Sequence, residues 1–184
     1  MKTNFRFIIA FLCSILILFT IISCNAETKL PAGPGTSPEE HNKSIVVQYF
    51  QEILDGKQYS QMPDVFTYDV VVHRPEGTLT YMDAIHAMFV KGLSPHTMVT
   101  TIHEMIASGD YVSVRLSHRM TYSAQEAFMQ SRLGNFDVRG KTIEWEAMAM
   151  FRFENGKIAE EWVSADELGK LMQIGTLELS VDEP

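Results

Sequence analysis

The chain has 184 residues and a formal net charge of −8, which suits one ordinary domain with short extensions. The acidic balance argues against nucleic acid as a partner, because binding phosphates requires clustered Lys and Arg side chains. The sequence contains no internal repeats and no low-complexity tracts, so a repeat array is excluded as well.

Residues 1–23 have the pattern of a targeting segment. Positive charges at Lys2 and Arg6 precede an apolar run that is short for a membrane span. The run ends in Ile-Ile-Ser-Cys24, which resembles the cleavage box of bacterial lipoproteins, where the cysteine is lipidated and becomes the first mature residue. We therefore expect a signal peptide and a lipid anchor on Cys24, with an uncleaved membrane anchor as the alternative. Either would place the protein outside the inner membrane, on its periplasmic side, on the outer membrane or at the cell surface.

The use of cysteine agrees with export. Cys13 would be removed with the signal peptide and Cys24 would carry lipid, so the folded part would have no thiol for disulfide or nucleophilic chemistry. Proline and glycine recur in residues 24–37, which we predict to be a flexible tether. The folded domain is then expected at residues 38–175, followed by a tail at 176–184.

The first part of this domain is predicted to be helical. Ser37 is a good N-cap residue, Pro38 suits the first turn, and apolar residues then recur at helical spacing until Gly56. Further elements are expected in chain order: a short helix near 60–66, a strand at 68–74 and a third helix at about 82–91.

The second part is predicted to be four long antiparallel strands. The first two occupy residues 96–107 and 111–122, and alternation in the latter indicates one buried face. The last two flank Asn155-Gly156, a strong signal for a tight hairpin because both residues tolerate positive φ. The segment 123–137 between the two strand pairs is interpreted as a helical insertion or a lid over a pocket.

Counting back from the Asn-Gly turn assigns the faces of the hairpin. One face is predicted to carry Trp145, Ala147, Ala149, Phe151, Phe153, Ile158, Glu160, Trp162, Ser164 and Asp166. This face is mostly apolar but includes two carboxylates, Glu160 and Asp166. Glu161 falls on the opposite face, beside Met148 and Met150.

The end of the chain also resembles a known family. The similarity rests on residues at a fixed spacing, which are Arg152-Phe153, Gly156-Lys157-Ile158, Glu160, Trp162, Asp166 and Gln173-Ile174-Gly175. This pattern resembles the SnoaL-like polyketide cyclases, or ester cyclases, of the nuclear-transport-factor-2-like superfamily. The resemblance implies an α+β fold: a cone-shaped α+β barrel in which a curved antiparallel sheet wraps on three N-terminal helices and leaves a ligand pocket at its open end.

The resemblance also implies a homodimer, and Met148 and Met150 would give the outer sheet face an apolar patch. The sequence departs from the family at residues 118–120, which read His-Arg-Met where members often carry Gly-Thr-His. This departure weakens any transfer of substrate from the family.

Asp166 is the first candidate for catalysis. On the apolar face near Trp145 and Trp162, its carboxylate would lose hydration, which favours use as a general acid or base. The resemblance implies the same role, because the family's catalytic acid/base matches this position. Asp166 also precedes a short predicted helix as a good N-cap residue, and both interpretations stay open.

Two histidines and one further carboxylate are also candidates. His73 matches a histidine that faces the pocket in similar proteins, and its alternative is a surface residue at a strand end. His118 shares a face with buried positions, so it is either a pocket residue or a satisfied core histidine. Glu160 is either a polar anchor in the pocket or half of an ordinary ion pair. The predicted pocket lining is Trp145, Ala147, Ala149, Phe151, Trp162 and His118.

No cofactor or metal is predicted, because the sequence has no zinc-helix spacing, no phosphate-binding glycine loop and no Gly-x-Ser-x-Gly motif. Two functions remain. One is a cofactor-free cyclase or isomerase in which Asp166 moves a proton alpha to a carbonyl, with His73 stabilising the enolate. The other is a non-catalytic, lipid-anchored domain that binds a small hydrophobic molecule. Polyketide assembly is cytoplasmic, so the expected location argues against cyclisation of that substrate.

Overall fold

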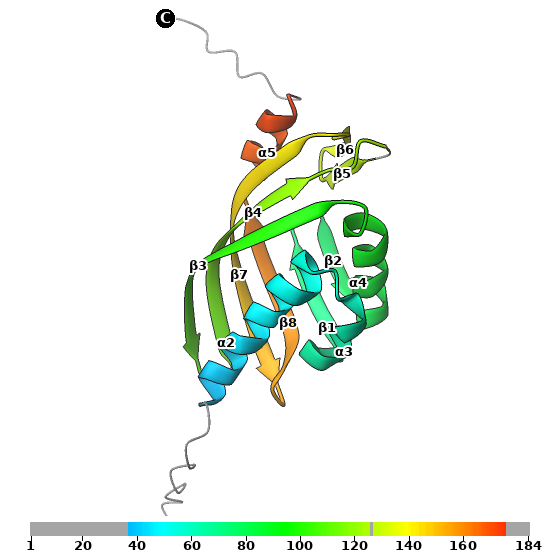
Figure 1. Cartoon of the computed structure of the whole chain (residues 1–184). Coiled ribbons are helices and arrows are strands. Elements are labelled where there is room, and N and C mark those ends of the chain that lie inside the picture. The colour runs from blue at the N-terminus through cyan, green and yellow to red at the C-terminus, as the bar shows by residue number, and fades with distance from the viewer. Residues whose placement is uncertain (1–36, 126, 176–184) are drawn as a thin grey trace, which may run out of the picture. The chain divides into compact units, whose positions relative to one another are not determined.

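The computed structural model describes residues 37–125 and 127–175 (Figure 1). The predicted signal peptide, the lipidation site at Cys24, the tether up to residue 36 and the tail at 176–184 lie outside the described residues. Within the described part, no helix has the length and apolar character needed to cross a bilayer.

The first helix lies across the concave side of the sheet (Figure 1). It begins as α2, Pro38–Gln48, and continues as a π-helical segment, Tyr49–Asp55. The Ser37 hydroxyl accepts a hydrogen bond from the Glu40 amide at 3.2 Å, which confirms the predicted N-cap. The helix stops at Gly56, where an added Cβ would lie 2.6 Å from the carbonyl oxygen of Glu52.

The remaining helices are short. They are a 3-10 turn at Tyr59–Gln61, α3 at Met62–Val65, α4 at Met82–Met88 with a π-helical extension at Phe89–Leu93, and α5 at Glu167–Ile174. The helix α5 ends at Gly175, whose φ of 82° is the left-handed conformation that glycine adopts without a steric cost. The helices predicted from 38, near 60–66 and at about 82–91 are therefore present, with boundaries shifted by a few residues.

The sheet has six strands in the order β2-β1-β8-β7-β4-β3. The strands are β1 (Phe66–Arg74), β2 (Gly77–Thr80), β3 (Thr97–Ser108), β4 (Tyr111–Thr121), β7 (Thr142–Glu154) and β8 (Lys157–Ala165). The sheet curves around the helical layer and does not close, which confirms the predicted α+β class (Figure 1). It is not purely antiparallel, because β1 and β8 pair in parallel. These two strands are far apart in sequence, so no hairpin forces them to run in opposite directions.

The segment 123–137 is a β-hairpin rather than a helix. Its arms are β5 (Phe128–Ser131) and β6 (Gly134–Asp137), which form a separate two-stranded sheet. The Val138 amide donates to the carbonyl of Ala127 at 3.0 Å, and both side chains are buried. The interpretation of this segment as a helix was wrong, because burial of apolar side chains such as Ala127 and Val138 outweighs a modest local helix preference.

The Asn155-Gly156 turn forms as predicted, with φ angles of 52° and 77°. Glu154 pairs with Lys157 and Phe153 with Ile158, but the next pair joins Arg152 to Glu160. One residue of β8, Ala159, therefore lies outside the pairing as a β-bulge. A bulge of one residue exchanges the two faces for every side chain beyond it.

The two arms of this hairpin consequently differ in how well their faces were predicted. In β7 the predicted inner residues Ala147, Ala149, Phe151 and Phe153 are buried. In β8 the prediction is wrong beyond Ile158: the cavity-lining residues are Glu161, Val163 and Ala165, and the alternate residues Glu160, Trp162 and Ser164 lie on the outer face.

Aromatic side chains fill the space between the first helix and the inner face of the sheet. The Tyr49 ring stands edge-on to Phe66 at 5.1 Å and to Phe151 at 6.0 Å, measured between ring centroids. Tyr49, Phe66, Phe89 and Phe151 are all fully or almost fully buried. This packed core leaves a cavity on its other side, bounded by Tyr49 and Phe50.

Candidate ligand-binding site

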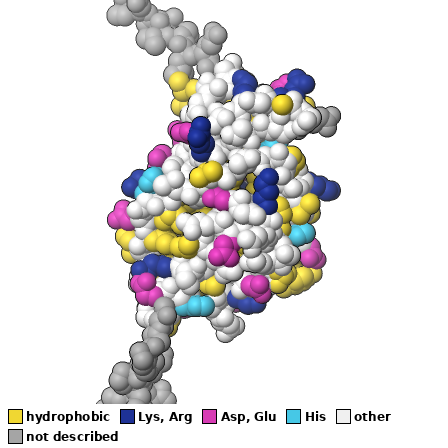
Figure 2. Space-filling view, in the orientation of Figure 1, with side chains coloured by type: hydrophobic (Ala, Val, Ile, Leu, Met, Phe, Trp, Pro, Cys, Tyr) yellow, Lys and Arg dark blue, Asp and Glu magenta, His cyan; other side chains and the backbone are white. Residues whose placement is uncertain are grey.

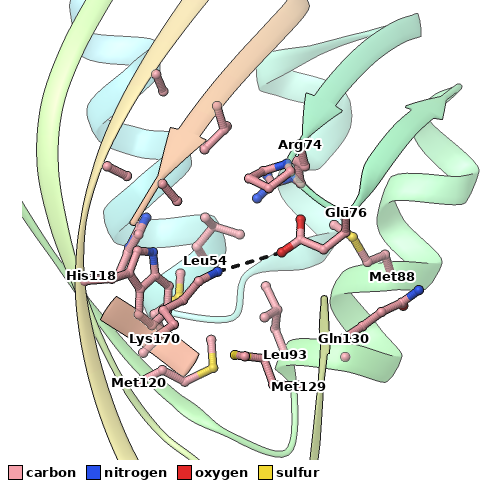
Figure 3. Close-up of a pocket in the computed structure, with 18 of the residues that line it drawn as sticks. Leu54, Arg74, Glu76, Met88, Leu93, His118, Met120, Met129, Gln130 and Lys170 are labelled. Atoms are coloured by element: carbon pink, nitrogen blue, oxygen red, sulfur yellow. Dashed lines mark ion pairs between the residues drawn. The ribbon is translucent and has the colours of Figure 1, made fainter. Parts of the chain in front are cut away.

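The cavity has a volume of about 500 Å³, which lies in the range of small-molecule pockets. It is lined by the inner faces of β4, β7 and β8, the turn between β1 and β2, the helix α5 and the β5–β6 hairpin. Most of the lining is apolar and includes Leu54, Leu79, Met88, Leu93, Met98, Leu116, Met120 and Met129. Several of these side chains surround the space in Figure 3. Flexible methionines can adapt to ligands of irregular shape.

The β5–β6 hairpin contributes directly to this lining. Phe128, Met129 and Gln130 border the cavity, and the Arg132 guanidinium donates to the carbonyl oxygen of Pro75 in the β1–β2 turn. The hairpin therefore borders the cavity and is hydrogen-bonded to the β1–β2 turn, which also lines it. This is the position expected of a lid.

A buried polar cluster of Tyr49, Arg74 and Glu161 lies at one side of the cavity. Arg74 Nη2 donates to the Tyr49 hydroxyl at 2.9 Å and lies 3.3 Å from Glu161 Oε1, while the Tyr49 hydroxyl is 3.4 Å from both Glu161 oxygens. The Glu161 side chain is only 1% exposed, and burial raises its pKa. Burial also raises the pKa of Tyr49, so this hydroxyl stays protonated and can donate to the carboxylate.

A second charged group spans the cavity. Lys170, from α5, forms an ion pair with Glu167 on its own helix and lies 3.8 Å from Glu76 in the β1–β2 turn. Figure 3 shows the Lys170 side chain reaching toward Glu76 across the space. Its ammonium group also lies 5.3 Å from the centroid of the Trp145 ring, a cation–π distance. Lys170 is only 6% exposed, so its charge is balanced mainly by these partners.

His118 enters the cavity from β4 (Figure 3). Its Nδ1 lies 3.0 Å from the Thr100 hydroxyl, and its ring packs between Phe50 and Trp145. Burial, and after it the positive charges of Arg74 and Lys170, lower the pKa of His118 to about 4. His118 is therefore a neutral imidazole at physiological pH.

The structure brings only part of the predicted site together. Trp145, Ala147, Ala149 and His118 line the cavity, whereas Phe151 is fully buried in the core beside it. Trp162 lies on the outer face of the sheet, so its predicted pocket position is wrong because of the bulge at Ala159. Whether the four lining residues bind a ligand stays a prediction.

His73 also lies on the outer face. Its Nε2 is 2.9 Å from Glu160, its Nδ1 is 3.3 Å from the Thr78 hydroxyl, and its ring stacks on Trp162. The pocket interpretation is therefore wrong for both residues, and each has the role that was its alternative. His73 is a surface residue at a strand end, and Glu160 is part of an ion pair. In β1 the inward residues are Val70, Val72 and Arg74, so strand alternation turns His73 outward.

Asp166 is exposed and does not line the cavity. Its Oδ1 accepts a hydrogen bond from the Gly169 amide at 2.8 Å, which makes it the N-cap of α5. The geometry thus gives Asp166 the capping role that the sequence left open, and its predicted position beside Trp145 and Trp162 in a pocket is wrong. The bulge is again involved, because it turns the preceding residue, Ala165, toward the cavity where Asp166 was expected.

Sequence reasoning missed several charged lining residues. Arg74 could have been found, because it alternates with the buried Val70 and Val72 of β1. Glu161 gave no signal, since its burial depends on the bulge. Lys170 stands three residues after Glu167, which reads as an ordinary pair on a helix surface.

Among residues 37–125 and 127–175, no three His, Cys, Asp or Glu side chains converge as a metal-binding group. On the face shown in Figure 2, acidic and basic side chains are interspersed rather than gathered into one basic patch.

The sequence model of the SnoaL-like domain matches residues 46–161, which is more than half of the chain. The chain belongs to the SnoaL-like domain family. The fold is that of the nuclear-transport-factor-2-like superfamily, which the curved, open sheet and the helices on its concave side also show. No curated protein matches the sequence at a significant level.

Solved structures of other proteins share this fold. IdmH of Streptomyces antibioticus, a proposed polyketide cyclase, is 17% identical with a TM-score of 0.59, over 73% of this chain and 98% of that one. A SnoaL-like polyketide cyclase of Agrobacterium tumefaciens is 18% identical with a TM-score of 0.58, over 73% and 98%. An LEH-like epoxide hydrolase of Mycobacterium tuberculosis is 10% identical with a TM-score of 0.59, over 73% and 89%. At these identities the likeness shows the fold, and activity has to be argued from the site.

Proposed function

We propose that this SnoaL-like domain binds a small, mostly apolar molecule inside its cavity. The observation that carries the proposal is the cavity itself, with about 500 Å³ of space and an adaptable lining that includes four methionines. The imidazole of His118 on the cavity wall would orient the ligand. The family supports a small-molecule role of this kind.

An aromatic fluorescent probe of naphthalene size tests this proposal. Ala149→Phe places a ring in the cavity, and we expect it to weaken probe binding by about tenfold or more, because the added volume takes the space that the probe needs. Met148→Phe is the matched control, since the neighbouring Met148 is 60% exposed on the outer face. Equal probe binding by both folded variants would contradict the proposal.

Cofactor-free isomerisation or cyclisation is a second candidate, favoured by a specific observation. His118 is a neutral imidazole on the cavity wall, and Arg74 and Lys170 are close enough to depress its pKa. His118 would remove a proton alpha to a carbonyl, and the imidazolium formed in this step would offset the charge of the enolate. Exchange of such protons with deuterated water, followed by NMR on a small ketone, should be catalysed by the wild type and not by His118→Phe. If the wild type gave no exchange above background, catalysis would be contradicted and only the binding role would remain.

We also propose that lipid on Cys24 anchors the domain outside the inner membrane. The support is the sequence alone: two early positive charges, an apolar run and Ile-Ile-Ser-Cys24. Mass spectrometry of membrane-extracted protein should find a lipidated Cys24 as the first residue. An intact Met1, or a soluble product that begins after Cys24, would contradict the anchor.

A further inference from the structure

Three residues from three different elements form a chain of hydrogen bonds that ends in the cavity. Asp55 lies at the end of the first helix, Thr100 in β3 and His118 in β4. The Asp55 carboxylate accepts from the Thr100 amide at 2.7 Å and from the Thr100 hydroxyl at 2.8 Å. The same hydroxyl oxygen lies 3.0 Å from Nδ1 of His118.

This arrangement determines which nitrogen of His118 carries the proton. A hydroxyl has a single hydrogen, and Thr100 donates it to the carboxylate of Asp55, which can only accept. The Thr100 oxygen must therefore accept from Nδ1–H of His118. In a neutral imidazole the other nitrogen, Nε2, is then unprotonated and is a hydrogen-bond acceptor.

Nε2 of His118 faces the cavity without a partner in the described chain. It makes no hydrogen bond to residues 37–125 or 127–175, and it is not among their fully buried polar atoms, so it is open to the space that His118 lines. A histidine that served only to fill the core would have both ring nitrogens satisfied. The three-residue chain instead holds one acceptor toward the cavity.

The charged side chains that line the cavity also limit the charge that a ligand can carry. Arg74 is paired with Glu161, and Lys170 with Glu167 and Glu76. These lining residues therefore offer no unpaired cation for a carboxylate or phosphate, and their carboxylates outnumber their cations. A neutral ligand fits this lining better than an anion does.

We propose that the cavity selects a neutral apolar molecule with a hydroxyl group, phenolic or enolic, and that this hydroxyl donates a hydrogen bond to Nε2 of His118. The inference rests on the proposed function, because it specifies the ligand of the same cavity. His118 is the contact residue, and Thr100 and Asp55 are positioning residues that fix its tautomer.

Three related probes test the inference on the purified protein: naphthol, its methyl ether and naphthoate. The ether keeps the rings and the oxygen but lacks the donor, and naphthoate replaces it with a negative charge. We expect the wild type to prefer naphthol over both by about tenfold, the size of one well-placed hydrogen bond. In His118→Phe the preference for naphthol over the ether should disappear while both still bind.

Thr100 provides a matched pair of variants that leaves the imidazole in place. Thr100→Ser keeps the hydroxyl, so the preference for naphthol should persist. Thr100→Val removes the hydroxyl and should reduce the preference. Nitrogen NMR of the His118 ring supplies a readout that packing alone would not change. Nε2 should be unprotonated in the wild type and in Thr100→Ser, and partly protonated in Thr100→Val.

The possible failures can be told apart. Equal affinity for naphthol and its ether in the wild type, or a protonated Nε2, would overturn the role of His118, while loss of binding in Ala149→Phe would keep the cavity as the site. Tighter binding of naphthoate would overturn the neutral ligand class. Absence of binding by all three probes would overturn the proposed function and this inference with it.

Discussion

Glu160 and Glu161 are neighbours in β8, yet they lie on opposite faces of the sheet. Glu160 is partly exposed, and its hydrogen bonds to His73 and then to Arg152 lower its pKa. Glu161 is 1% exposed, and burial raises its pKa although Arg74 lies beside it. Water screens the first carboxylate and is excluded from the second, so the two chemically identical side chains should differ widely in what they contribute.

The largest effect is expected for Glu161→Gln. The change keeps the shape of the side chain but leaves the largely buried Arg74 guanidinium without its counter-charge. Removing one partner of a buried pair typically costs 3–5 kcal/mol, and the partial exposure of Arg74 suggests about 3 kcal/mol. Urea unfolding of the variant and the wild type measures the difference. A loss below about 1 kcal/mol would mean that water reaches this cluster.

His118 should make stability depend on acidity. Its pKa is about 4 in the folded protein against 6.5 for the free side chain, so only the unfolded state takes up this proton between those values. Stability should therefore fall as the pH drops from neutral toward 4, by about 3 kcal/mol from this residue. Because other groups of the protein also respond to pH, the measurement is the difference between wild type and His118→Gln. A pH dependence shared by both proteins would contradict the buried, neutral imidazole.

Asp166 lies outside the cavity and should have an intermediate effect. Asp166→Ala removes the cap of α5 and should cost roughly 0.5–2 kcal/mol, whereas Asp166→Asn should be nearly silent because Asn caps a helix about as well. Thermal unfolding of both variants measures these costs. Loss of a catalytic activity in Asp166→Asn, with stability unchanged, would revive the acid/base role that the family resemblance implied.

The smallest effect is expected for Glu160→Gln, the outer-face counterpart of Glu161→Gln. Surface ion pairs contribute at most about 1 kcal/mol, and the His73–Glu160–Arg152 group is open to water. The variant should lose less than this in urea unfolding, and added salt should reduce the difference. A cost equal to that of Glu161→Gln would remove the distinction between the two faces of β8.

The local signals of the sequence determined the elements and the fold class. Ser37 and Pro38 start the first helix, Asn155-Gly156 closes the last hairpin, and alternation assigns the inner face of β7. These features depend on residues that are close in sequence, so their spacing and turn preferences can be recognised without the tertiary structure. The inward position of His118 followed from the same alternation.

Tertiary structure alone decided which polar groups meet in the cavity. One bulged residue, Ala159, turns Glu161 inward and Glu160 and Trp162 outward, and no local pattern marks it. The chain from Asp55 through Thr100 to His118 joins residues of three elements, so only the folded sheet brings them within hydrogen-bonding distance. A period of two residues makes strand faces easy to predict, and for the same reason a single inserted residue is enough to exchange them.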